Sequence, residues 1–181
     1  RPVTKVGVVG AGLMASQLAL LFVRRLNVPV VITDLDQSRV DKGLAYIHGE
    51  IDKLHAKGRM SQDAVNRTKA LVTGSVTKEA FADADFVIEA VFEELNVKKQ
   101  VFAEGEAVVS PECILATNTS SLSVTEMGRD LEHPERLVGF HFFNPVAVMP
   151  LLEIAATEWT SDSALSTAFV LGKKLKKTTV K

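Results

Sequence analysis

The strongest constraint on the fold is an apolar run that leads through a glycine loop directly into an apolar helix. Val6-Gly7-Val8-Val9 precedes Gly10-Ala11-Gly12-Leu13-Met14-Ala15, and apolar residues at helical spacing continue to Leu26. A strand, a tight turn and a helix in this order are the context of a dinucleotide-binding loop. Gly10 permits the turn, and Gly12 lets the backbone approach a pyrophosphate at the positive end of the helix. Because glycine pairs also occur in ordinary turns, the flanking elements carry this prediction.

Two residues near the loop refine the expected ligand. Ala15 takes the third small position, where alanine still allows the helix to pack on the strand. Asp34 closes the second predicted strand, 24 positions after Gly10, where its carboxylate can accept both ribose hydroxyls of adenosine. A 2'-phosphate would meet a like charge there, and Arg39 is expected to face water, so NAD is predicted rather than NADP. The alternative is that Asp34 is a turn residue or a helix cap.

Val- and Ile-rich runs alternate with longer amphipathic stretches, as in repeated strand-helix units around a parallel sheet. We therefore predict an α/β chain of the Rossmann type, with a mostly parallel sheet flanked by helices and residues 1–181 forming one domain. Strands are expected at 6–9, 30–33, 71–73, 86–90, 114–117 and 137–140, with further extended segments at 150–155 and near 178. Helices are expected at 13–26, 38–57, 64–69, 96–109 and 162–176.

The helix after the second strand is longer than a strand crossover requires. Residues 38–57 would span about 30 Å at about 1.5 Å per residue, so we expect a projecting arm, followed by a helix that Ser61 caps. Ser123 and Glu126 have capping-box spacing, which predicts a helix beginning just after Asn118-Thr119-Ser120-Ser121. This polar turn follows the carboxyl end of a strand, where open parallel sheets bind their ligands.

A second run carries groups suited to proton transfer. His141-Phe142-Phe143-Asn144-Pro145 supplies a histidine and an amide, and Glu153 follows twelve residues after the histidine. Histidine can act as a general base near neutral pH, and a carboxylate can orient the ring and stabilise its protonated form. Since twelve residues exceed one helical face, contact between His141 and Glu153 would require the tertiary fold. The alternative is that His141 only ends a buried strand and bonds to backbone.

Other polar residues have both a local and a functional interpretation. Glu89, Glu93, Glu94 and Lys98 follow the fourth strand, where most such charges are solvated and complement the helix dipole. Alternatively, Glu93 bonds the nicotinamide ribose, with Lys98 as its neighbour. The Asn118 and Ser120 side chains are explained by turn chemistry, or Ser120 donates to a substrate oxygen. No Gly-x-Ser-x-Gly elbow surrounds Ser120, so a nucleophilic serine is not expected.

Composition excludes several classes of protein. A net charge of -1 provides no basic surface for nucleic acid. The one cysteine, Cys113, excludes an internal disulfide and is expected to be buried. No apolar run reaches the roughly 18 residues of a membrane span, and no signal-peptide apolar region opens the chain. The four histidines lack metal-ligand spacing, so no metal is expected, and His48 and His55 suit an exposed helix. We expect a soluble intracellular protein.

Four motifs stand out along the chain: Gly-Ala-Gly-Leu-Met at 10–14, Glu-Ala-Val-Phe-Glu at 89–93, Asn-Thr-Ser-Ser-Leu at 118–122 and His-Phe-Phe-Asn-Pro at 141–145. In order and in spacing, and over nearly the whole chain, they resemble those of the L-3-hydroxyacyl-CoA dehydrogenase family. The detailed resemblance is to the dehydrogenase part of multifunctional fatty-acid β-oxidation proteins of the alpha-subunit type, which Lys57-Gly58-Arg59-Met60 also matches. Two departures are Ala15, where glycine is common, and the absence of the all-helical domain that forms much of the acyl pocket.

The resemblance implies NAD-dependent oxidation of (S)-3-hydroxyacyl-CoA to 3-oxoacyl-CoA. His141 would be the catalytic base with Glu153 as its partner. Ser120 would contact the 3-hydroxyl, and Asn144 would hold substrate and nicotinamide in register. The arm would lie against acyl-CoA, with Lys57 a loosely assigned contact. The matched cofactor positions are Gly10, Gly12, Leu13, Met14, Asp34, Glu93, Lys98, Ser120 and Asn144.

Two other interpretations stay open. Without the helical domain, the chain as supplied would be a catalytically silent NAD-binding fragment. A β-hydroxyacid dehydrogenase of the phosphogluconate type would use a lysine base, but the polar 118–121 turn and the His141–Glu153 pair argue against it. The resemblance also implies an acyl-CoA partner, membership of a multienzyme β-oxidation complex, and location in a bacterial cytoplasm or an organelle matrix.

Overall fold

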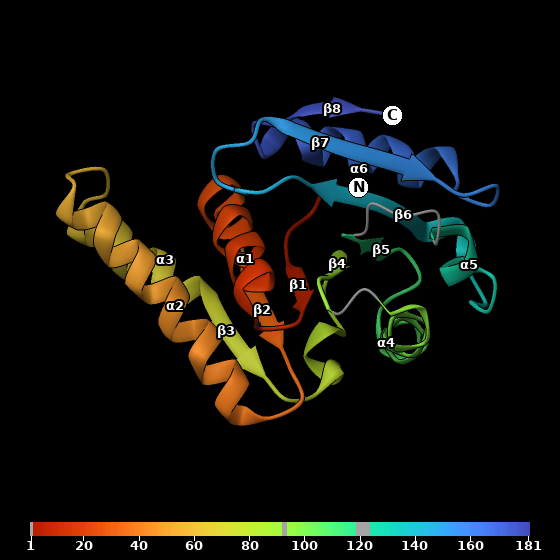
Figure 1. Ribbon diagram of the computed structural model, residues 1–181, viewed down its shortest axis with the longest axis horizontal. Helices are drawn as coiled ribbons and strands as arrows, with labels where there is room; N and C mark the ends of the chain where they lie inside the picture. Colours follow the sequence, from red (N-terminus) through yellow and green to blue (C-terminus); the bar gives the residue numbers. More distant parts are fainter. Residues whose placement is uncertain (1, 92–93, 119–123) are drawn as a thin grey trace.

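The predicted sheet is present in the computed structural model, which describes residues 2–91, 94–118 and 124–181. The eight strands of this described part lie in the order β3-β2-β1-β4-β5-β6-β7-β8 (Figure 1). The first six are parallel, β7 is antiparallel to β6, and β8 is parallel to β7. The mostly parallel α/β architecture is confirmed. The bounds are β1 Val6–Val9, β2 Val30–Thr33, β3 Val72–Ser75, β4 Phe86–Glu89, β5 Ile114–Thr117, β6 Leu137–Phe142, β7 Leu151–Ala156 and β8 Thr178–Val180.

The helices that flank the sheet begin and end close to the predicted residues. The helix over 64–69 is longer than predicted, and two short 3-10 helices, Lys78–Phe81 and Pro134–Arg136, were not predicted because they are too short to show a period. The predicted cap at Ser123 lies outside the described residues. The bounds are α1 Leu13–Leu26, α2 Gln37–Ala56, α3 Gln62–Leu71, α4 Leu95–Val108, α5 Val124–Gly128 and α6 Asp162–Lys174.

The projecting arm is the pair α2 and α3, which runs outward from the β3 end of the molecule, opposite the β7, β8 and α6 end (Figure 1). Asp36 caps α2 by accepting the Arg39 N–H at 2.9 Å. Ser61 caps α3 by accepting the Ala64 N–H at 3.2 Å, as predicted. Local capping chemistry thus fixes where both arm helices begin.

The two faces of the sheet are covered by different helices, and strand residues alternate between them. Phe140 and Phe142 of β6 pack with Phe22 of α1 and Phe86 of β4, at ring-centroid distances of 5.1 to 6.2 Å. The opposite face packs against α4 and α5 in a second apolar cluster. Because neighbouring strand residues point to opposite faces, His141 lies on the α4 and α5 face.

Three further expectations about single residues have different outcomes. Cys113 is buried, as predicted. His55 is exposed as predicted, with its Nδ1 2.8 Å from the Met60 carbonyl oxygen. His48 is instead half-buried, because the side of α2 that carries it is partly covered, and its Nε2 has no hydrogen-bond partner in the described chain. Among the described residues, no helix combines the length and the apolar character needed to cross a membrane.

Candidate functional site

The carboxyl ends of five parallel strands bring the candidate residues to one edge of the sheet. Asp34 directly follows β2, the glycine loop follows β1, and Glu89 ends β4. Asn118 follows β5, and His141 is the penultimate residue of β6. In the strand order β2-β1-β4-β5-β6, these residues form a row from Asp34 to His141. Open parallel sheets bind ligands at this edge, near the point where the chain reverses its direction of strand addition.

The glycine loop has the conformation and the space that a pyrophosphate requires. Gly10 has φ +120°, and a Cβ there would lie 3.1 Å from the Ala90 carbonyl oxygen. A Cβ on Gly12 would meet nothing within 4 Å. Gly12 caps α1 without a side-chain hydrogen bond, and the first turn of α1 has no acidic residue. The free N–H groups of this turn can therefore hold an anion, and the loop fits a dinucleotide.

Residues beside the loop complete its packing. Ala15 is fully buried, and its Cβ would lie 3.2 Å from a Cβ on Gly10, so a small side chain is needed there. Leu13 is 63% exposed, whereas Met14 is half-buried and packs against the core. The predicted contacts of Leu13 and Met14 with the cofactor remain predictions. Of the two side chains, that of Leu13 is the more exposed to solvent.

Asp34 combines the two interpretations given for it. Its Oδ2 accepts the Ala11 N–H at 3.0 Å and its Oδ1 accepts the Leu35 N–H at 2.7 Å, so it ties the end of β2 to the glycine loop. Its side chain remains 19% exposed, and a carboxylate has about four acceptor positions, so ribose hydroxyls can still bond. Arg39 faces water, as expected, with its side chain 54% exposed. Its guanidinium also lies 3.8 Å from Asp34 Oδ1 and 3.6 Å from Asp36, because opposite charges attract.

Replacing Asp34 by serine is expected to raise the dissociation constant of NADH about tenfold or more, because hydrogen bonds to a charged group contribute about 1.5–3 kcal/mol. The preference for NADH over NADPH should narrow, because Arg39 would then be free to meet a 2'-phosphate. Fluorescence titration with both nucleotides measures the change. Asp36→Ser is the matched control, since serine preserves the helix cap while removing a nearby carboxylate. An unaltered NADH affinity in the Asp34 variant would contradict the ribose assignment.

Glu89 was expected to be solvated, and that prediction is wrong. The Glu89 and Lys98 side chains are 0% and 2% exposed, and Lys98 Nζ donates to Glu89 Oε1 at 2.8 Å. Thr117 Oγ1 donates to the same oxygen, and the Val91 N–H donates to Oε2 at 3.1 Å. Burial of a carboxylate requires such partners. The sequence did contain a signal, because the predicted bounds of the fourth strand, 86–90, included Glu89, although the residue was interpreted as following that strand.

Helix α4 begins with the local chemistry that was expected of Glu94, which caps the helix by accepting the Asn96 and Val97 N–H groups. Glu93 and Ser120, together with the rest of segments 92–93 and 119–123, lie outside the described residues. Their predicted contacts with cofactor and substrate therefore stay predictions.

Asn118 connects three strands beside the histidine. Its Oδ1 accepts the Phe142 N–H at 2.9 Å, and its own N–H donates to the Glu89 carbonyl oxygen at 3.1 Å. The turn interpretation of Asn118 missed this link, because its partners lie 24 and 29 residues away along the chain. The amide thereby fixes the end of β5 to the backbone that carries His141.

His141 and Glu153 meet through the tertiary fold, as the sequence required. The two residues are direct cross-strand partners of β6 and β7. Directly opposed residues have Cβ atoms about 4.5–5.5 Å apart on the same face of the sheet. His141 Nδ1 is buried and has no hydrogen-bond partner in the described chain, which leaves a position that a carboxylate can fill. His141 was expected to follow the strand, but β6 continues through it to Phe142 because β7 pairs with this stretch.

The turn after β6 carries Asn144, which is exposed beside the strand end. Lys177 Nζ donates to the Val146 and Met149 carbonyl oxygens, at 2.6 and 2.7 Å, and so fixes the backbone of this turn. Burial lowers the pKa of Lys177, and the nearby Arg25 lowers it further. The predicted role of Asn144 stays a prediction.

Comparison with known proteins matches residues 5–181 to the family model described as 3-hydroxyacyl-CoA dehydrogenase, NAD binding domain. The chain belongs to this family. The resemblance drawn from the four motifs is thereby confirmed, and NAD is the cofactor of this domain family.

Relatives of this 3-hydroxyacyl-CoA dehydrogenase domain are multifunctional proteins. The chain is 38% identical over 180 residues to the peroxisomal fatty acid beta-oxidation multifunctional protein of Arabidopsis thaliana, covering 99% of this chain and 25% of the relative. It is 40% identical over 177 residues to the peroxisomal bifunctional enzyme of Homo sapiens, covering 98% and 24%. The chain therefore spans about a quarter of the length of these relatives.

A solved dehydrogenase has the same fold. The (S)-3-hydroxybutyryl-CoA dehydrogenase of Ralstonia eutropha superposes with a TM-score of 0.93 at 31% sequence identity. The match covers 99% of this chain and 63% of that protein. The fold and the sequence comparisons thus agree on the dehydrogenase family.

Proposed function

We propose that residues 1–181 form one NAD-binding domain that interconverts (S)-3-hydroxyacyl-CoA and 3-oxoacyl-CoA in fatty-acid β-oxidation. The observation that carries this proposal is the cross-strand pairing of His141 with Glu153 at the same sheet edge as the glycine loop. A base next to a dinucleotide site suits oxidation of an alcohol, because the hydroxyl proton must leave as hydride is transferred. The relatives named for β-oxidation support an acyl-CoA substrate.

The order of residues along the edge gives the orientation of the ligands. Asp34, at the end of β2, holds the adenosine ribose. The Gly10–Gly12 loop, at the end of β1, holds the pyrophosphate. The nicotinamide half then extends over β4 and β5 towards His141, where Glu93, Lys98 and Ser120 are its proposed neighbours. When bound, NAD supplies the hydride acceptor for the alcohol.

His141 removes the hydroxyl proton as general base. Glu153 accepts from Nδ1, the buried nitrogen without a partner in the described chain, which leaves Nε2 for the substrate proton. The carboxylate orients the ring and favours its protonated form, so that in reverse the imidazolium returns the proton to the forming alkoxide. Ser120 and Asn144 position the substrate oxygen against this nitrogen.

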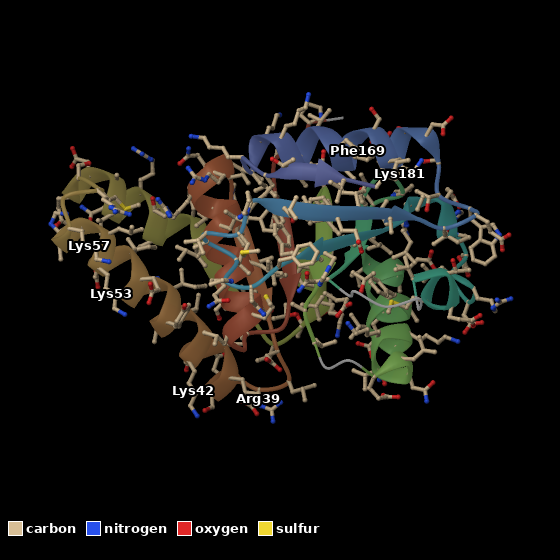
Figure 2. All side chains as sticks on the ribbon, turned by 45° about the horizontal axis from the view of Figure 1, so that its top comes forward. Arg39, Lys42, Lys53, Lys57, Phe169 and Lys181 are labelled. Carbon is tan, nitrogen blue, oxygen red and sulfur yellow. The ribbon has the colours of Figure 1, made fainter. Side chains whose placement is uncertain are left out.

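The arm is the proposed support for the CoA head group. Figure 2 shows Arg39 and Lys42 near the beginning of α2, and Lys53 and Lys57 near its far end. Lys57 is exposed at the C-cap of α2, whereas Lys53 pairs with Glu50 at 3.1 Å. An exposed ammonium attracts phosphate as a point charge, so Lys57 is the proposed contact for the charged head of CoA.

The relatives also indicate partners and location in outline. They include peroxisomal proteins and the alpha subunit of a bacterial fatty acid oxidation complex, from Vibrio campbellii. We propose that the chain works within a multienzyme β-oxidation system, in a bacterial cytoplasm or an organelle matrix.

Oxidation of NADH with acetoacetyl-CoA tests the proposed function, with NADH binding measured separately by fluorescence. Turnover that depends on acetoacetyl-CoA supports the dehydrogenase. Binding without turnover would favour the silent NAD-binding fragment. Failure to bind NADH would contradict both.

A further inference from the structure

Fold stability alone does not explain the buried ion pair between Glu89 and Lys98. Glu89, at the last position of β4, is the register partner of Thr117 on β5, and Lys98 reaches it from α4. Three donors converge on its two oxygens, from Lys98, Thr117 and the Val91 backbone. Replacing a buried ion pair by well-packed apolar residues is often neutral or stabilising, so its presence calls for a role other than stability.

Glu89 holds the backbone that directly follows β4. Its carboxylate holds the Val91 N–H, and the Ala90 N–H donates to the Val9 carbonyl oxygen at 3.0 Å. The Ala90 carbonyl oxygen lies against Gly10, 3.1 Å from where a Cβ would be. One carboxylate thereby connects the glycine loop, the turn after β4 and the first turns of α4.

This connection lies beneath the expected path of one half of the cofactor. Asp34 places the adenosine on the β2 side of the glycine loop, so the other half of NAD passes over β4 and β5. Glu89 and Thr117 are the last residues of these two strands, on the sheet face that α4 covers. Glu89 is fully buried, so it acts on the cofactor through the groups that it holds, the Lys98 ammonium and the Val91 N–H.

We infer that Glu89 is a positioning residue for the nicotinamide-ribose half of NAD, acting through Lys98 and the turn at Val91. The inference rests on the cofactor orientation of the proposed function, and does not require acyl-CoA turnover. It separates Glu89 from the glycine loop and Asp34, which hold the adenosine diphosphate half. Changes at Glu89 should therefore affect the two halves of the ligand differently.

Binding of NADH and of ADP to the complete chain tests this separation, because ADP lacks the second ribose and the nicotinamide. Glu89→Gln and Lys98→Met are each expected to weaken NADH about tenfold or more while leaving ADP affinity unchanged. The double variant should weaken NADH no further than the stronger single variant, because both residues act in one unit. Lys99→Met is the matched control on the same helix, since Lys99 forms a partly exposed ion pair with Asp130.

A variant that leaves one buried charge unpaired can fail to fold, so thermal unfolding is measured in parallel. Thr117→Val retains both charges and the side-chain shape, and it should weaken NADH selectively by a smaller factor. The double variant Glu89→Gln/Lys98→Met removes both charges together. A folded double variant with wild-type NADH affinity overturns the inference. So does additivity of the two single variants, or an equal loss of NADH and ADP affinity.

Discussion

Replacing His141 by alanine is expected to lower acetoacetyl-CoA-dependent oxidation of NADH about 10²- to 10⁴-fold, the usual contribution of a positioned general acid or base. NADH affinity should not change, because His141 lies on β6, two strands beyond the β4 end and away from the glycine loop. Steady-state kinetics and fluorescence titration on the same preparations measure the two quantities. Loss of turnover alone identifies His141 as the proton-transfer residue.

Two further variants sharpen this experiment. His133→Ala is the matched control, because His133 is an exposed histidine whose Nδ1 pairs with Glu135 at 3.3 Å. Glu153→Gln should reduce turnover less than His141→Ala, since the imidazole stays in place and loses only the carboxylate that orients it. Parallel loss of turnover and of NADH binding in His141→Ala would instead identify a structural histidine.

Gly10→Ala is expected to lower the stability of the fold, whereas Gly12→Ala is expected to weaken NADH binding. Gly10→Ala forces a Cβ into a positive-φ conformation and towards the Ala90 carbonyl oxygen. The strain is about 1–3 kcal/mol, which lowers the melting temperature by roughly 2–12 °C for a chain of this size. Gly12→Ala should leave the melting temperature unchanged, because its Cβ meets no protein atom within 4 Å.

NADH binding distinguishes the Gly12→Ala variant from the Gly10→Ala variant further. The methyl group of Gly12→Ala would occupy the space expected for the pyrophosphate, so the dissociation constant of NADH should rise about tenfold or more. Calorimetry of unfolding and NADH titration, run on both variants, give the comparison. A Gly12 variant that binds NADH normally would show that the pyrophosphate does not approach this backbone.

The elements predicted from sequence were those whose signals are local. Helix α1 has its predicted bounds, because an apolar period and the preceding glycine loop mark its ends directly. Capping at Ser61 was likewise visible, since the serine and its acceptor role lie within one turn. The family resemblance also depended on short motifs, each readable without knowledge of tertiary contacts.

The parts that were missed depend on contacts between distant residues. The family resemblance paired His141 with Glu153, but the antiparallel register of β6 and β7 that places them opposite each other could not be predicted from their spacing. Glu89 was assigned to solvent because its partners are distant in sequence: the lysine that neutralises it lies on α4, and the threonine that donates a hydrogen bond to it lies on β5.

The packing of β6 in the hydrophobic core decides which face of the sheet the His141 side chain lies on. Phe140 and Phe142 are anchored among aromatic rings on one face, so the intervening residue must emerge on the other. Inserting or deleting one residue within the strand would exchange the faces, placing a phenylalanine where His141 now lies and the imidazole among apolar rings. Evolution can therefore vary the length of the loops around this site, but the strand itself can change only by substitution.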